Sequence, residues 1–219
     1  MTSVVNVAVE AALAAGKIQA EHADKIQSIS EKSGLRGDVV TEVDLLCEKE
    51  IIDRIKKVFP DDTILAEESG ETLGDVSKKW IIDPLDGSLN YSHGYPCYCV
   101  SIGVEHEGEL VVGVIYNPNL DELFIAEKGQ GATLNGKTIK VSTTKTLEKS
   151  LLVTGFSPKI LGVWSLSMHP ALPIVSRPTS HFGFFVERLA CLKHMRPILF
   201  MGMRLSHLGP RIAVLQKYW

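Results

Sequence analysis

Two short apolar runs in the first half of the chain each end in carboxylates. Residues 63–66 lead into Glu67 and Glu68, and residues 80–82 lead into Asp83. Apolar runs of this length are typical of strands. Neighbouring strands would bring Glu67 and Asp83 together at their tips, where each close pair of carboxylates costs on the order of 4 kcal/mol at an effective dielectric near 20. The pattern therefore predicts that a cation lies among these acids.

A tight turn follows the second run. Pro84 fixes its own φ angle, and we expect it to end the strand. The bend then brings the carboxylates of Asp83 and Asp86 and the carbonyl of Leu85 toward one point. Oxygen donors of this kind, with no His or Cys among them, favour Mg²⁺ over Zn²⁺. The glycine and serine that come next allow backbone N–H groups to approach a phosphate at the start of a helix. The turn therefore predicts a metal and a phosphate bound together.

Three blocks of the sequence carry a family resemblance. The run W-I-I-D-P-L-D-G-S-L-N-Y at residues 80–91 resembles the D-P-[IL]-D-G-[ST] signature of the inositol monophosphatase family, whose members are Mg²⁺-dependent phosphomonoesterases. Upstream, A-E-E-S at residues 66–69 and D-V-V-T-E-V-D at residues 38–44 resemble two further blocks of that family, in the right order and spacing. The resemblance implies that the metal ions are bound by Glu67, Asp83, the Leu85 carbonyl and Asp86.

The resemblance also implies phosphate-binding and catalytic roles. Gly87 and Ser88 are expected to bind the substrate phosphate, and Asp38 is expected to pair with the Ser88 hydroxyl. The implied catalytic set is Asp38, Ser88 and Glu67. The family usually has Thr at the position of Ser88, and both residue types carry a hydroxyl. The residues alone leave a plainer alternative open for Asp38, because it precedes a helix that starts near Thr41 and would serve there as a helix-start residue only.

By the same resemblance, the chain hydrolyses a small phosphorylated alcohol, above all inositol monophosphate. One metal, held by Glu67, Asp83 and the Leu85 carbonyl, lowers the pKa of a bound water. Asp38 and Ser88 orient this water for in-line attack. A second metal between Asp83 and Asp86 stabilises the leaving alkoxide. Two alternatives stay open. One is a sibling specificity for histidinol phosphate, fructose bisphosphate or a 3′-phosphonucleotide, and the other is a non-catalytic fragment or pseudoenzyme that keeps the metal and phosphate site without turnover.

The remaining patterns predict a layered α+β fold. Apolar residues at helical spacing indicate helices over residues 4–20 and 41–58, and Thr41 with Asp44 resembles a capping box at the second start. Antiparallel strands are expected at residues 97–105, 110–116, 122–126, 131–134 and 137–141, the last two joined by a turn at Asn135-Gly136. The resemblance narrows this to the α/β/α/β sandwich of the inositol monophosphatase and fructose bisphosphatase type, with its second half lost or replaced.

The last third of the chain differs from the rest in charge. Residues 1–150 hold 25 acids and 15 Lys and Arg, whereas residues 151–219 hold one acid and eight Lys and Arg. The family normally has a late W-D-x-A-A-G block whose Asp completes the second metal site, but no Asp follows Asp121 here. We therefore expect a metal- and phosphate-binding α+β domain at residues 1–157 and an atypical basic, Pro-rich tail of unknown structure at 158–219.

Three explanations of this tail stay open: a wrong reading frame or aberrant splice end, a strongly diverged sequence, or a new basic module for nucleic acid or another anionic surface. Its basic residues are scattered without a recognisable motif, so we expect no nucleic-acid partner. The expected partner is the small phosphorylated alcohol substrate, with a homodimer suggested by the resemblance. The chain has neither a stretch of about 20 apolar residues nor a leader of secretory type, which predicts no membrane partner and a cytoplasmic location.

Four cysteines are spread along the chain without metal-ligand spacing. Cys97 and Cys99 alternate as strand residues do, and the other two are Cys47 and Cys191. Because no C-x-x-C pair occurs, we expect buried reduced thiols rather than a disulfide or a zinc site.

Overall fold

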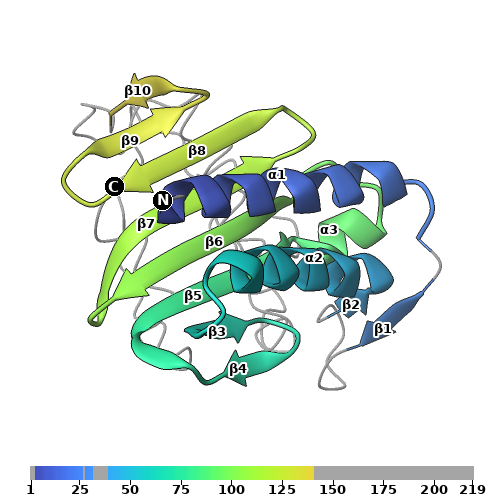
Figure 1. Cartoon of the computed structure of the whole chain (residues 1–219). Helices are drawn as coiled ribbons and strands as arrows, with labels where there is room; N and C mark the ends of the chain where they lie inside the picture. Colours follow the sequence, from blue (N-terminus) through green and yellow to red (C-terminus); the bar gives the residue numbers. More distant parts are fainter. Residues whose placement is uncertain (1–2, 27, 32–38, 141–219) are drawn as a thin grey trace, which may run out of the picture.

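In the described part of the chain, two helices lie across one face of a large sheet. The computed structural model describes residues 3–26, 28–31 and 39–140. Figure 1 shows helices α1 and α2 side by side on the same face of the sheet. The helices are α1 (Val4–His22), α2 (Glu42–Val58) and the short α3 (Ser88–Ser92). The strands are β1 (Ile29–Glu31), β2 (Val39–Thr41), β3 (Asp62–Ala66), β4 (Gly70–Thr72), β5 (Asp75–Asp86), β6 (Cys99–His106), β7 (Glu109–Asn117), β8 (Glu122–Glu127), β9 (Gly131–Leu134) and β10 (Lys137–Ile139).

The order of the strands explains how two distant segments meet. The eight-stranded sheet has the order β10-β9-β8-β7-β6-β5-β3-β4, and β1 and β2 form a separate two-stranded ribbon. Strands β6 to β10 form the expected antiparallel meander, and β5 extends it by pairing antiparallel with β6. Strands β3 and β5 are parallel neighbours. A parallel pair needs a crossover connection, and here the edge strand β4 lies within it. The carboxyl ends of β3 and β5 therefore meet at the same edge.

Small residues on α1 allow the helix to lie close to the sheet. Its buried face is rich in alanine, and Gly16 sits where a Cβ atom would come within 2.4 Å of the Tyr116 ring. The helix begins after Ser3, whose hydroxyl accepts a hydrogen bond from the Asn6 N–H at 3.2 Å. The core between helices and sheet then fills with larger groups, including Ile51 and Trp80.

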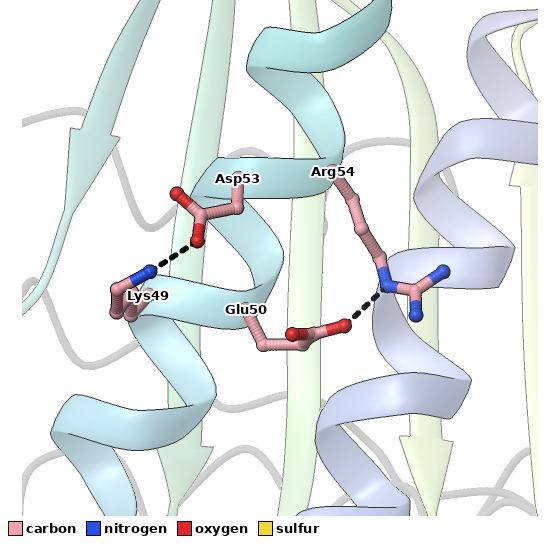
Figure 2. A network of polar contacts seen from close by, with 4 residues as sticks. All are labelled: Lys49, Glu50, Asp53 and Arg54. Atoms are coloured by element: carbon pink, nitrogen blue, oxygen red, sulfur yellow. Dashed lines mark hydrogen bonds and ion pairs between the residues drawn. The ribbon is translucent and has the colours of Figure 1, made fainter.

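Helix α2 confirms the predicted capping box. The Thr41 hydroxyl accepts from the Val43 N–H at 3.2 Å, and the Asp44 carboxylate accepts from the Thr41 N–H at 2.9 Å. The solvent face of the same helix carries two ion pairs at i, i+4 spacing, Lys49 with Asp53 and Glu50 with Arg54 (Figure 2). Such exposed pairs contribute little to stability because solvent screens them. The inner face of α2, in contrast, faces the sheet and the site described below.

Other expectations are confirmed or corrected in the meander. The Asn135-Gly136 turn joins β9 to β10, with both residues at positive φ (48° and 75°), as a two-residue hairpin turn of this composition requires. We expected Pro84 to end its strand, and this expectation is wrong. Strand β5 continues to Asp86, and its pairing with β6 shifts between Asp83 and Asp86. Proline is tolerated at such an irregularity because no regular ladder hydrogen bond is needed from its nitrogen.

The cysteine and strand expectations hold in part. Cys47 and Cys99 are buried thiols, whereas Cys97 is half-buried and precedes β6, which begins at Cys99 rather than at the expected residue 97. Cys191 and the predicted tail at residues 158–219 lie outside the described residues. None of the helices in the described part is both long and apolar enough to cross a lipid bilayer.

Candidate active site

The predicted meeting of Glu67 and Asp83 is built by the parallel pair of strands. Ala66 of β3 lies opposite Ile82 of β5, and the Glu67 N–H donates to the Ile82 carbonyl at 3.1 Å. The residues that follow this last pair, Glu67 and Asp83, are therefore neighbours across the strand ends. The sequence predicted that strand pairing would bring the two acids together, and the register of β3 and β5 confirms it.

The carboxylates at this edge of the sheet lie close together and are shielded from solvent, which makes their negative charges unfavourable. Asp83 is 8% exposed and Asp86 is fully buried, while Glu67 is half-buried. The pKa of Asp83 is raised well above its usual range, first by burial and then by the negative charges of Glu67 and Asp86. Contact with the Glu67 carboxyl group and the charge of Asp44 raise the pKa of Asp83 further. A carboxyl in these surroundings gains most from a bound cation.

The hydrogen bonds of Asp83 also indicate a place for a cation, because among the described residues only one of its two carboxylate oxygens has a donor. Its Oδ1 accepts from the Leu85 N–H at 3.2 Å, whereas Oδ2 is buried and makes no hydrogen bond within the described part of the chain. A buried carboxylate oxygen without a donor is costly, and a hard cation would satisfy it. The donor set of Glu67, Asp83 and Asp86 therefore fits Mg²⁺ in chemistry. Across residues 3–26, 28–31 and 39–140, no three His, Cys, Asp or Glu side chains converge into a ready-made metal cage.

The turn after Asp83 leads directly into α3. Gly87 has φ +100°, and a Cβ there would come within 2.8 Å of the Cys97 carbonyl, so glycine is needed at this bend. The Leu85 carbonyl, an expected metal ligand, accepts a hydrogen bond from the Ser88 hydroxyl at 2.9 Å. A carbonyl oxygen has two lone pairs, so this contact leaves one for a metal.

The Ser88 hydroxyl also donates to the Asp44 carboxylate, with an Oγ to Oδ1 distance of 2.7 Å. Asp44 is fully buried on α2. The expected partner of Ser88 was Asp38, which lies outside the described residues, so its pairing with Ser88 stays a prediction. The sequence did mark Asp44, as the last residue of the D-V-V-T-E-V-D block, but only as part of a capping box. Its contact with Ser88, 44 positions along the chain, has no local signal.

Two further side chains hold the loops of the site, and sequence reasoning missed both. Glu48 of α2 accepts hydrogen bonds from the backbone N–H groups of Glu68 and Ser69 at 2.8 and 3.0 Å. The Gln19 side-chain amide of α1 donates to the Pro84 carbonyl at 2.8 Å. In the sequence, each is a polar residue on an otherwise apolar face of its helix. This pattern predicts that the side chain is buried but does not identify its hydrogen-bond partner.

Comparison with known proteins now decides the family. A model described as the inositol monophosphatase family matches residues 1–165. The chain belongs to the inositol monophosphatase family. This confirms the resemblance seen in the three sequence blocks, and magnesium-dependent phosphatase activity is the general function of that family. The match extends a little beyond the expected domain boundary at residue 157, which itself stays a prediction.

Curated relatives carry two kinds of name. "Inositol-1-monophosphatase" of Synechocystis is 52% identical over 155 residues, which are 70% of this chain and 53% of the relative. "Nus factor SuhB" of Xylella fastidiosa is 42% identical over 155 residues, which are 71% of this chain and 56% of the relative. The chain therefore spans little more than half the length of these inositol monophosphatase relatives.

Solved structures of the family confirm the fold. The extragenic suppressor protein suhB of Bartonella henselae is similar with a TM-score of 0.67 and 41% identity, over 70% of this chain and 59% of that one. An IMPase/NADP phosphatase, complexed with Mg²⁺ and phosphate, is similar with a TM-score of 0.56 and 25% identity, over 62% of this chain and 51% of that one. The α+β layering expected from the sequence is thus the fold of the described residues.

Proposed function

We propose that this chain belongs to an enzyme that hydrolyses a small phosphate monoester with Mg²⁺. The observation that carries the proposal is the group of acids at the strand ends, the buried Asp83 and Asp86 with the half-buried Glu67, and Ser88 at the start of the adjoining α3. Acids buried together in this way need a cation, and oxygen donors select a hard one. The family assignment and the Mg²⁺ and phosphate bound by a structural relative support the same chemistry.

The proposed roles follow the donors present in the chain. Glu67, Asp83, the Leu85 carbonyl and Asp86 would hold the metal. When bound, Mg²⁺ lowers the pKa of a water and stabilises negative charge on the reacting phosphate.

Ser88 and its partner carry the proposed catalytic work of the chain itself. Because the Ser88 proton is directed to Asp44 and the Leu85 carbonyl, the Ser88 oxygen is left as an acceptor that orients the proton of an attacking water. Glu67 would contact the same water, and Gly87 with Ser88 would contact the phosphate. Asp38, from the expected catalytic set, remains proposed as a further orienting acid.

Inositol monophosphate is the proposed substrate, because the Synechocystis relative bears the name inositol-1-monophosphatase. Histidinol phosphate, fructose bisphosphate and 3′-phosphonucleotides are the sibling substrates to compare. A second candidate function is metal and phosphate binding without turnover. It is favoured by one sequence observation, the lack of any Asp after Asp121 to serve as the late metal ligand of the family.

One experiment separates these functions. The full chain and its Asp83→Asn variant are titrated with Mg²⁺ by calorimetry and assayed for phosphate release from inositol monophosphate. Asp53→Asn, an exposed acid of α2, is the matched control. Mg²⁺ binding and phosphate release that Asp83→Asn removes would support the enzyme. Binding without release would support the second candidate. The proposal fails if the unmodified chain binds no Mg²⁺, or if Asp83→Asn binds it as tightly as the control.

The homodimer, the cytoplasmic location and the expected lack of a nucleic-acid partner are also proposals. The mobility of a labelled RNA in the presence of the full chain tests the expected lack of a nucleic-acid partner directly.

A further inference from the structure

Glu48 is a buried acid beside the site that the proposed chemistry does not use. It lies on the inner face of α2 and is 4% exposed. Both of its carboxylate oxygens accept hydrogen bonds from the loop that follows β3. Oε2 accepts from the Glu68 N–H at 2.8 Å, and Oε1 accepts from the Ser69 N–H at 3.0 Å.

These two contacts are stronger than an ordinary side-chain contact to a loop. Hydrogen bonds to an ionised acceptor are about twice as strong as neutral ones, and two parallel bonds fix direction as well as distance. Burying a carboxylate is costly unless donors satisfy it, so the Glu48 side chain and the two amides hold each other in place. The loop is therefore fixed to α2 directly after Glu67, the proposed metal ligand.

The position of Glu48 on its helix adds a second reason. Asp44 lies one helical turn before it, and residues four apart share one face of a helix. Asp44 binds the Ser88 hydroxyl beyond β5, while Glu48 binds the loop beyond β3. One helix thus contacts the segments that follow both strand ends of the site.

We propose that Glu48 is a positioning residue that orients Glu67 toward Asp83, so that both carboxylates bind the same divalent cation. This inference rests on the metal site of the proposed function and adds a determinant of its affinity. Loss of a supporting hydrogen bond behind a metal ligand typically lowers metal affinity by about 10- to 100-fold. Glu48→Gln retains the size of the side chain but presents an NH₂ group to one of the two amides, so one bond is lost.

The test measures Mn²⁺ affinity of the full chain by electron paramagnetic resonance and, separately, hydrogen exchange at the Glu68 and Ser69 amides. Glu50→Gln is the matched control, because it removes one acid from the exposed side of the same helix (Figure 2). We expect Glu48→Gln to weaken Mn²⁺ binding at least 10-fold and to speed exchange at both amides, with Glu50→Gln unchanged. A merely structural role would lower the unfolding midpoint without changing the affinity of the folded protein.

Two outcomes overturn the proposal in different ways. Wild-type Mn²⁺ affinity in Glu48→Gln would remove the role of Glu48 and leave the metal site standing. Failure of the unmodified chain to bind Mn²⁺ would overturn both. If Glu48→Gln does not fold, Glu48→Asp takes its place, because it keeps the charge and shortens the reach by one methylene. The same weakening and faster exchange are then expected, and wild-type affinity in Glu48→Asp overturns the proposal equally.

Discussion

Removing the hydroxyl of Ser88 should weaken the whole fold as well as the site. In Ser88→Ala the buried Asp44 carboxylate loses the donor that lies 2.7 Å from its Oδ1, and the Leu85 carbonyl loses a second contact at 2.9 Å. A hydrogen bond to a charged group is worth about 1.5–3 kcal/mol, and a buried acceptor left without its donor costs a similar amount. We expect a loss of about 2 kcal/mol in the free energy of unfolding.

Urea denaturation followed by circular dichroism measures this loss directly. A change of about 2 kcal/mol corresponds to a fall in Tm of about 4–8 °C for a domain of this size. Ser92→Ala is the matched control, because Ser92 lies on the same short helix and its hydroxyl donates to a neutral group, the Leu89 carbonyl. Alanine is also the better helix former, so the control should change stability by about 0.5 kcal/mol or less.

The difference in stability loss between Ser88→Ala and Ser92→Ala tests whether the Ser88 hydroxyl supports a buried charge. If Ser88→Ala costs no more than Ser92→Ala, then the Ser88 hydroxyl does not support a buried charge and its assigned place in the site is wrong. Ser88→Thr, which retains the hydroxyl and matches the usual family residue, should lose less stability than Ser88→Ala. A larger loss in Ser88→Thr would mean that space around the side chain, rather than the hydrogen bond, governs this position.

Three further predictions concern the acids and the helix packing. Metal affinity should fall most in Asp83→Asn, less in Glu67→Gln and least in Asp86→Asn, because Asp83 is the ligand proposed to be shared; calorimetry with Mg²⁺ gives the order, and a larger loss in Asp86→Asn would contradict it. Without metal, Asp83→Asn should raise the urea midpoint, because it removes a buried charge beside two others, and a lower midpoint would show that Asp83 stabilises the fold. Gly16→Ala should lower stability by about 1 kcal/mol in the same urea assay, because the clash with the Tyr116 ring outweighs the gain in helix propensity, and unchanged stability would mean that the ring moves aside.

The parts of the fold that local chemistry determines were predictable from the sequence. The Thr41 cap and the Asn135-Gly136 turn are such cases, since each depends on residues within three positions of one another. The meeting of Glu67 and Asp83 was also predictable, because two apolar strands with acids at their ends leave few arrangements other than side by side.

The hydrogen bonds that hold the loops of the site could not be predicted from local sequence. Glu48 and the loop amide it binds at Glu68 are 20 positions apart, and Gln19 and the Pro84 carbonyl are 65 apart. A helical pattern shows that Glu48 and Gln19 fall on a buried face, but not which strand end faces them. Pro84 failed as a strand terminator for a related reason, since the irregular pairing that tolerates it belongs to two strands together.

The hydrogen bonds of the buried acids suggest how supporting and metal-binding roles are divided among them. Asp44 and Glu48 receive donors from the chain itself. Asp44 accepts from the Ser88 and Thr41 hydroxyls and from the Thr41 N–H, and Glu48 accepts from two backbone amides. Asp83 has a donor at Oδ1 only, and within the described residues its buried Oδ2 makes no hydrogen bond. A folded chain can supply donors to a carboxylate at any buried position, so a buried carboxylate oxygen without a donor, beside helix acids that are satisfied, marks a place for a ligand from outside. By this criterion the helix acids are supports and Asp83 belongs to the proposed metal site, a distinction that residue type alone does not make.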